Sequence, residues 1–300
     1  MLVAEKLLHV VHVSGDASSR RALERFYFDV FAAQTYFEAC AVESMPREES
    51  MLLIADVCVI PLSPTDLASD EARSLAAFAG RFSQMAIKVP DARAAAAHLR
   101  AHAITPQYLH PRHETLFFVT DPAETLGVRF EFCAVNIPND LRLRAGWSPR
   151  WWAHHHPLAI EGLSAIVTAT DDLARASTFY TDVLGMTPLG QRETIELGAK
   201  VGAFRIGAEK PFVIEAWEPS GTRSPVGQYL AEFGGGIFAL DFRTGSVDAV
   251  VHHLEATGVR HRRDSPHRVT IDPIDSFGVT LSFVDESPWD RRAPVAAKKG

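Results

Sequence analysis

The spacing of apolar residues predicts strands and helices that follow one another in a regular order. Residues 7–14 are apolar and rich in β-branched side chains, which is typical of a strand. Ser18 or Ser19 can cap the helix that we expect after it. Two or three further strands are predicted at residues 36–42 and 51–62. Together these elements form one βαβββ unit, or module.

The same order is predicted three more times. A strand at 82–89 precedes a helix capped by Asp91, and a strand at 163–170 precedes a helix that begins after Asp172. A fourth strand at 236–242 precedes a helix over 246–258. Further strands are expected at residues 107–109, 115–119, 128–133, 194–197, 203–206 and 212–217, and a connector that may be helical at 66–80. The pattern predicts an α+β fold of four modules, paired in two halves because a single module leaves its sheet half covered.

One stretch of the sequence occurs twice, as an internal repeat. Residues 121–132 read DPAETLGVRFEF, and residues 272–283 read DPIDSFGVTLSF. Asp-Pro marks a turn, and the glycine can adopt backbone conformations that other residues avoid. Glu131 in the first copy corresponds to Ser282 in the second. The repeat indicates a duplicated scaffold with a polar site in one copy.

Composition changes between the halves and at the end of the chain. Residues 136–159 are rich in Pro, Trp and His, and we expect a linker that packs along the surfaces of both halves. The domains are therefore predicted at 1–135 and 160–286. The tail, residues 287–300, is polar with small side chains, so we expect it to be disordered.

Bulk properties narrow the class of protein. The 300 residues are 47% hydrophobic and 22% charged, as in globular proteins, and the net charge of −7 argues against nucleic-acid binding. Cys40, Cys58 and Cys133 lie in apolar contexts and are expected to be free thiols. The sequence has no apolar run long enough for a membrane span and no signal-peptide core, so we predict a cytoplasmic protein.

The start of module 3 resembles a known family. Asp172-Leu-Ala-Arg-Ala, Phe179-Tyr180 and Val183-Leu-Gly resemble the opening of a glyoxalase/bleomycin-resistance module, and residues 121–132 look like its close. These modules define the vicinal oxygen chelate superfamily. The resemblance implies tandem glyoxalase-like domains, each built of two modules that curl into an open barrel-like sheet around a cavity. It also implies a small-molecule substrate and one divalent metal ion.

The resemblance implies metal ligands in the first half. First-strand ligand positions fall on His9 and Gln84, and the last-strand carboxylate falls on Glu131. A further last-strand position falls on Pro61, whose side chain cannot bind metal. The ion is expected to be Fe, Mn, Zn or Ni, and an amide ligand favours ions other than Fe. Singly, His9 could be an ordinary strand histidine and Glu131 a surface carboxylate.

The equivalent positions of the second half are Ala165, Ile237 and Ser282, and only Glu215 in module 3 keeps a carboxylate. The second half is therefore expected to bind no metal. This is the reverse of extradiol ring-cleavage dioxygenases, whose four-module layout the chain otherwise resembles.

Other side chains could take part in catalysis. His113 and Tyr108 could face the same cavity, His113 as a general acid or base and Tyr108 as a group that orients a substrate oxygen. His110 is expected in a solvated turn, and His12 on the strand face opposite His9. His252 and His253 are expected on a helix surface.

Three functions fit these residues. The first is an extradiol-type dioxygenase that cleaves an aromatic ring, the leading hypothesis by a narrow margin. The second is a glyoxalase-type lyase, isomerase or epimerase, which mixed Gln/His/Glu ligands suit better. The third is a non-enzymatic protein that sequesters a small planar molecule. The sequence leaves the substrate and the oligomeric state open, with a homo-oligomer among the options.

Overall fold

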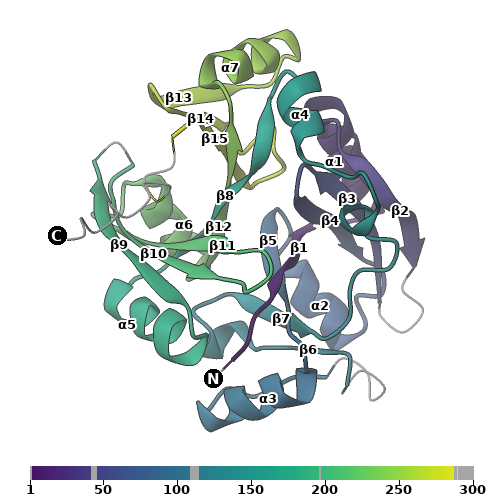
Figure 1. The fold of residues 1–300 in the computed structure, drawn as a ribbon, viewed down its shortest axis with the longest axis vertical. Coiled ribbons are helices and arrows are strands. Elements are labelled where there is room, and N and C mark those ends of the chain that lie inside the picture. The colour runs from purple at the N-terminus through teal and green to yellow at the C-terminus, as the bar shows by residue number, and fades with distance from the viewer. Residues whose placement is uncertain (1, 42–45, 109–114, 196, 287–288, 290–300) are drawn as a thin grey trace, which may run out of the picture.

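The computed structural model describes residues 2–41, 46–108, 115–195, 197–286 and 289 (Figure 1). The first half holds modules 1 and 2. Its elements are β1 (Lys6–Val13), α1 (Ala17–Phe31), β2 (Gln34–Ala41), β3 (Arg47–Ile54), β4 (Val57–Pro64), α2 (Asp70–Ala76), β5 (Arg81–Lys88), α3 (Ala92–Ala101), β6 (Phe117–Val119) and β7 (Arg129–Cys133).

The second half repeats this arrangement in modules 3 and 4. Its elements are β8 (Ile160–Ala169), α5 (Leu173–Thr178), β9 (Thr187–Thr194), β10 (Ala199–Ile206), β11 (Phe212–Pro219), α6 (Pro225–Phe233), β12 (Gly236–Thr244), α7 (Val247–Ala256), β13 (His261–Ser265), β14 (Arg268–Ile271) and β15 (Thr280–Val284).

Both halves have the same strand order. The first runs β2-β3-β4-β1-β5-β7-β6, and the second runs β9-β10-β11-β8-β12-β15-β14-β13. In each half the two first strands pair antiparallel, and each first strand pairs parallel with the last strand of its own module. Modules therefore pair within the chain, module 1 with 2 and module 3 with 4. The predicted α+β fold of tandem glyoxalase-like domains is confirmed.

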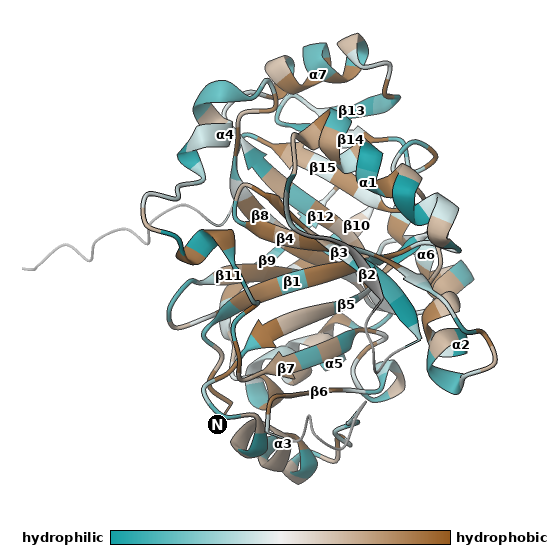
Figure 2. Ribbon diagram, turned by 90° about the vertical axis from the view of Figure 1, so that its right-hand side faces the viewer, coloured by the Kyte–Doolittle hydropathy of each residue, from teal (hydrophilic) through white to brown (hydrophobic). Residues whose placement is uncertain are grey.

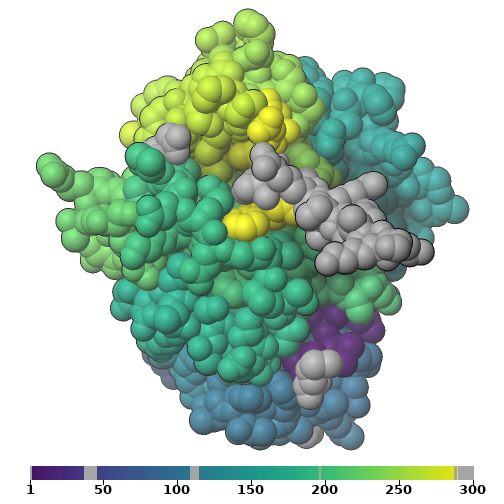
Figure 3. Space-filling model, turned by 60° about the vertical axis from the view of Figure 1, so that its left-hand side comes forward, coloured from purple at the N-terminus to yellow at the C-terminus, as the bar shows by residue number. Residues whose placement is uncertain are grey.

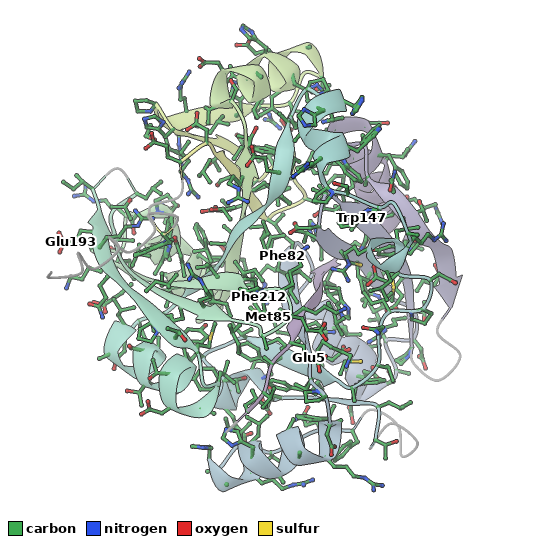
Figure 4. All side chains as sticks on the ribbon, viewed as in Figure 1. Glu5, Phe82, Met85, Trp147, Glu193 and Phe212 are labelled. Carbon is green, nitrogen blue, oxygen red and sulfur yellow. The ribbon has the colours of Figure 1, made fainter. Side chains whose placement is uncertain are left out.

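The halves share a hydrophobic core. β5 pairs with β12 through a single residue pair, Phe82 and Ile237, which joins the two sheets. Phe82 and Met85 of β5 and Phe212 of β11 belong to one buried cluster and gather near the centre of the molecule (Figure 4). Apolar colour follows the central strands, while the helices show polar colour as well (Figure 2). The halves therefore have a common interior.

The repeated stretch forms the tightest contacts between the halves. A Cβ atom on Gly127 would lie 2.1 Å from Gly235 O, and a Cβ on Gly278 would lie 2.4 Å from Gly80 O. Both Gly127 and Gly278 have positive φ, at +80° and +91°. Each copy of the motif thus contains a glycine that backbone contact and conformation both require.

Helices of one half also reach the other. His98 Nε2 on α3 donates to Val183 O at 2.8 Å, and His253 Nε2 on α7 donates to Val30 O at 3.0 Å. The two histidines are equivalent, each lying seven residues after a helix N-cap, Asp91 or Ser246. The expectation that His253 lies on the free surface is therefore wrong, whereas His252 is exposed as expected.

The expected linker contains two short helices, a 3₁₀ helix at Leu141–Leu143 and α4 (Arg150–His155). Trp152 on α4 is buried, and its Nε1 donates to Phe31 O at 3.3 Å. Arg142 binds Asp140 and reaches the carbonyl oxygen of Leu8 at 3.0 Å. This segment therefore packs against the first half, and its Trp147 lies beside the N-terminal strands (Figure 4).

Three expectations need correction or lie outside the described residues. The strand expected at 194–197 is β9, which ends at Thr194, because a largely exposed strand gives a weak apolar pattern. The helix expected after Asp172 ends at Thr178 and continues as a π-helical turn over Phe179–Val183. Of the tail, only Trp289 is described, so its expected disorder lies outside the described residues. Among the described residues no helix has the length and apolarity needed to cross a membrane.

Candidate metal centre

The three predicted ligands line one cavity in the first half, which we call cavity 1. β1 supplies His9, β5 supplies Gln84 and β7 supplies Glu131. Strand register explains the convergence, because Ala86 lies opposite both His9 and Glu131, two residues along β5 from Gln84. Side chains two residues apart share a face of the sheet. Cavity 1 has a volume of about 250 Å³.

The three side chains are in contact or nearly so. Gln84 Nε2 donates to Glu131 Oε2 at 2.9 Å, and His9 Nε2 lies 3.7 Å from the same oxygen. His9 and Glu131 are 8% and 10% exposed, so water solvates neither group well. His9 Nδ1 is buried and has no hydrogen-bond partner among the described residues. A buried polar atom without a partner is costly, but it is Nε2 and not Nδ1 that faces Glu131, so an ion shared with Glu131 would bind Nε2.

Burial decides the protonation of the site. Desolvation, followed by the positive charges of Arg47 and Arg142, lowers the pKa of His9 to about 3. Desolvation also raises the pKa of Glu131 to about 7, although Arg47 opposes this shift. At neutral pH His9 is therefore a neutral imidazole, which is the form that binds a metal ion.

The residues present fit a divalent cation. Imidazole nitrogen and carboxylate oxygen bind such ions at about 2.1 Å, so atoms up to about 4 Å apart can share one ion. His9 Nε2 and Glu131 Oε2 satisfy this limit at 3.7 Å. The third donor is an amide, and no group of three His, Cys, Asp or Glu side chains suited to a metal occurs among the described residues. The centre therefore depends on Gln84 as the third ligand.

Sequence reasoning missed two charged residues of the cavity. Arg47 and Glu49 of β3 line cavity 1, and Arg47 Nε lies 2.9 Å from Glu49 Oε2. The strand was expected to begin only at Met51, which also lines the cavity. The signal was present, because positions 47, 49 and 51 alternate with the period of a strand whose alternate side chains share a face.

The remaining walls of cavity 1 are mostly apolar. Strand residues and the segment after β7 provide them: Leu8, Val11, Met51, Ile60, Phe117, Cys133, Val135, Asn136, Ile137 and Pro138. A small number of convergent polar groups in an apolar cavity is the usual form of a small-molecule site.

Only one of the two predicted catalytic residues, Tyr108, lies among the described residues. Tyr108 does not line cavity 1; its hydroxyl accepts from Arg100 Nη2 of α3 at 3.2 Å, and its ring lies 6.1 Å from that of Phe118. Phe118 faces the helices, whereas its neighbour Phe117 faces the cavity. The prediction for Tyr108 is therefore wrong, because the residue lies under α3. His113 and His110 lie outside the described residues.

Two of the predicted equivalent positions are displaced. Ile60, not Pro61, lines cavity 1, while Pro61 lies opposite His12 on the other face of the sheet. His12 itself contacts Tyr27 from that face, as expected. In module 4, Ile237 belongs to the core shared with the helices, and Ala239 takes the interior position. Neither change adds a metal ligand.

The interior of the second half has different polar side chains from those of cavity 1. Ala165 and Ser282 occupy their predicted positions and offer no strong ligand. Glu215 is buried, and both of its oxygens accept from indole nitrogens, Oε2 from Trp217 at 2.7 Å and Oε1 from Trp289. Asp241, which the sequence analysis did not single out, is also buried there.

Comparisons with known proteins match this fold. A family model described as the Glyoxalase/Bleomycin resistance protein/Dioxygenase superfamily matches residues 162–285. A triple mutant of 4-hydroxymandelate synthase from Streptomyces coelicolor is 14% identical, with a TM-score of 0.68 over 95% of this chain and 93% of that one. Methylmalonyl-CoA epimerase from Mycobacterium tuberculosis is 27% identical, with a TM-score of 0.39 over 43% of this chain and 90% of that one. A comparison with curated protein sequences finds no significant match.

Proposed function

We propose that cavity 1 is the active site of a metal-dependent enzyme. The second half of the chain belongs to the glyoxalase/bleomycin resistance/dioxygenase superfamily, and the whole chain has the fold of a tandem vicinal oxygen chelate protein. The substrate of the enzyme is a small molecule with two adjacent oxygen atoms, and its reaction is a proton transfer of the isomerase, epimerase or lyase type. The free thiols of Cys58 and Cys133 support a cytoplasmic location.

His9, Gln84 and Glu131 would hold the divalent ion. A bound ion of this kind polarises substrate oxygens and lowers the pKa of the adjacent C–H bond. Three protein ligands leave coordination positions open for both substrate oxygens. The apolar walls exclude water from the substrate and strengthen the electrostatic interactions inside the cavity.

The observation that carries the proposal is a second carboxylate in the same cavity. Glu49 lines cavity 1 from β3, while the three ligands come from β1, β5 and β7. Its side chain is 11% exposed and is held by Arg47. Glu49 would accept the substrate proton, because a fixed carboxylate near the reacting carbon is a suitable general base.

Ring cleavage is the second candidate. The apolar walls, with Phe117 and Met51, suit a planar aromatic ring. Non-haem Fe(II) oxygenases, however, characteristically use two histidines and one carboxylate. Of the described residues that line cavity 1, one is a histidine, His9, and this favours the proton-transfer reaction over ring cleavage.

Metal content and solvent isotope exchange test the proposal. The purified protein should contain about one divalent ion per chain, and His9→Ala and Glu131→Ala should lose it. Small hydroxy-carbonyl compounds should then incorporate deuterium from D₂O with the native protein. Glu49→Gln should keep the metal and lose the exchange, and Glu193→Gln, on the exposed strand β9, is the control that should change neither.

Each alternative gives a different result. Stoichiometric iron with oxygen uptake on catechols would favour ring cleavage over proton transfer. Native protein that binds no metal, even after reconstitution with Mn, Zn, Ni and Fe, would reject the centre. Cavity 1 would then be a binding site without catalysis.

A further inference from the structure

The second half contains a larger and more polar cavity, which we call cavity 2. It has a volume of about 450 Å³, and the side chains used below are Arg192, Glu215, Asp241, Asp264, Arg268 and Trp289. Figure 3 shows the yellow end of the described chain between the green surface of module 3 and the yellow-green surface of module 4. Cavity 2 shares no lining residue with cavity 1.

Opposite charges are paired in cavity 2. Arg268 makes a two-pronged contact with Asp241, Nη1 to Oδ2 at 2.7 Å and Nη2 to Oδ1 at 2.6 Å. Arg192 Nη2 lies 3.6 Å from Glu215 Oε2. Asp264 is paired from outside by Arg262, at 2.6 Å. The buried part of the cavity therefore presents both signs of charge a few ångströms apart.

Two indoles complete this arrangement. The guanidinium of Arg268 lies 5.4 Å from the centre of the Trp217 ring, and that of Arg192 lies 5.6 Å from the centre of the Trp289 ring. Both indole N–H groups donate to Glu215. The rings hold the charged groups in place and offer flat surfaces to a ligand.

The pairing leaves hydrogen-bonding capacity unused. The Nε atoms of Arg192 and Arg268 are buried and make no hydrogen bond among the described residues. Each carboxylate oxygen can accept a further hydrogen bond beyond those it receives here. A molecule that fits must therefore bring an acceptor for the guanidinium groups and a donor for the carboxylates.

Charge narrows the class of ligand further. An anion would meet the carboxylates of Glu215 and Asp241, and a cation would meet the guanidinium groups of Arg192 and Arg268. A dipolar molecule with no net charge can place each end beside its opposite. Such complementarity discriminates between ligands, because like charges in contact strongly disfavour binding.

An adjoining space can take an apolar group. It has a volume of about 370 Å³ and shares Leu197 and Arg268 with cavity 2. Trp217, Val226, Phe238 and Ile271 form much of its wall. We propose that cavity 2 is a metal-independent binding site for a zwitterionic amino acid with an apolar side chain. The carboxylate binds Arg192 and Arg268, the ammonium lies beside Glu215 and Asp241, and the side chain enters the adjoining space.

A matched ligand series tests the charge requirement. L-Leucine is the zwitterion, 4-methylpentanoate lacks the ammonium and 3-methylbutylamine lacks the carboxylate. Binding to the full-length protein is measured by calorimetry and by intrinsic fluorescence, since Trp217 and Trp289 line the site. EDTA is present so that a metal ion cannot chelate leucine. We expect leucine to bind about tenfold or more tightly than either analogue.

Variants place the binding in cavity 2. Arg192→Gln should weaken leucine binding by about tenfold, because this partly exposed arginine loses its charge while the buried Glu215 keeps its hydrogen bonds from the indoles of Trp217 and Trp289. Arg205→Gln, on an exposed position of the neighbouring strand β10, is the matched control and should bind normally. Trp289→Phe keeps a ring but loses the N–H donor to Glu215, so it should alter the fluorescence response.

Several results would overturn the proposal. It fails if leucine does not bind, or if either singly charged analogue binds as tightly as leucine. It also fails if Arg192→Gln and Arg205→Gln behave alike. Loss of leucine binding in Glu131→Gln would assign the binding to cavity 1 instead. The proposal does not depend on the function of cavity 1, so either can fail alone.

Discussion

The two cavities lie on sheets with the same strand order, but the side chains that line them differ in kind. Equivalent positions hold His9 and Ala165 on the first strands of modules 1 and 3, and Glu131 and Ser282 on the last strands of modules 2 and 4. Cavity 1 has apolar walls, and its His9 Nδ1 has no partner among the described residues. In cavity 2 the charged groups neutralise one another in pairs.

This difference separates function from stability. A side chain that is buried without a full set of partners costs folding free energy, and such sites are typical of ligand binding. Removing one partner of a buried ion pair, by contrast, leaves an uncompensated buried charge and is strongly destabilising. We therefore expect a carboxylate mutation in cavity 1 to act on ligand binding with little effect on the fold, and a carboxylate mutation in cavity 2 to act on the fold as well as on ligand binding.

The largest expected effect tests that contrast in the second half. Asp241→Ala leaves Arg268 buried without its bidentate partner, so the free energy of unfolding should fall by about 3–5 kcal/mol. Asp248→Ala breaks the exposed ion pair with Arg263 and should cost less than about 1 kcal/mol. Urea unfolding monitored by circular dichroism measures both. Equal losses would mean that the buried pair is not structural.

The next largest effect is expected at the two equivalent glycines that contact the backbone of the other half. Gly127→Ala and Gly278→Ala each place a Cβ against backbone of the other half, at a positive φ. Each should lower the free energy of unfolding by about 3 kcal/mol or more. Gly258→Ala, also at positive φ but with nothing within 4 Å, should cost about 1 kcal/mol. A large loss in only one of the two copies would show that the halves are not joined equivalently.

Acid should weaken the first half through His12. Burial lowers the pKa of His12 to about 4, whereas an unfolded histidine titrates near 6.5. Because the unfolded chain then binds a proton that the folded chain does not, the free energy of unfolding falls as the pH falls from 6.5 to 4, by up to about 3 kcal/mol. The equivalent residue of module 3 is Thr168, which contacts the Tyr180 hydroxyl as His12 contacts that of Tyr27.

His12→Thr gives the first half the residue that the second half has at the equivalent position. The variant should flatten this part of the pH dependence of the free energy of unfolding. Urea unfolding at a series of pH values between 4 and 7.5 gives the slope. His252→Thr is the control, because the His252 side chain is 82% exposed and its replacement should leave the slope unchanged. An unaltered slope in His12→Thr would assign the acid sensitivity to other groups.

The smallest effect is expected in cavity 1. Glu131→Gln removes a buried carboxylate but keeps an oxygen that can accept from Gln84. In EDTA, the free energy of unfolding should therefore be unchanged or higher by up to about 1 kcal/mol. The same variant should lose metal in the presence of divalent ions. A clear loss of stability without metal would make Glu131 a structural residue.

Periodicity in the sequence predicted the modules, and the resemblance to glyoxalase-like modules implied the three candidate ligands. Strand and helix periods appear directly in the spacing of apolar residues, and the position of a residue before a helix cap fixes its place on the first strand. His9 and Gln84 each lie seven residues before a helix N-cap, Asp16 of α1 (rather than the expected Ser18 or Ser19) and Asp91 of α3, and both line cavity 1. The same count from Ser246, the α7 N-cap, leads to Ala239 rather than the predicted Ile237.

Other features depend on which way a strand bends or where a loop runs. β-Bulges shift the register between β1 and β5 and between β8 and β12, and a one-residue shift moves a side chain to the other face. One such shift lies between Ile237 and Ala239, and Ala239 takes the interior position. Tyr108 lies under α3 because of packing that no local pattern encodes.

The sequence by itself determined the local elements and the duplication, because these follow from periodicity, and its resemblance to glyoxalase-like modules implied the three candidate ligands. Only the tertiary structure decided that Arg47 and Glu49 join the ligands, since β3 is brought to cavity 1 by pairing with β4. It also decided that Arg192, Asp241, Arg268 and Trp289 meet in cavity 2. These groups are distant along the chain, and their meeting depends on strand pairing and burial, which act between segments rather than within them.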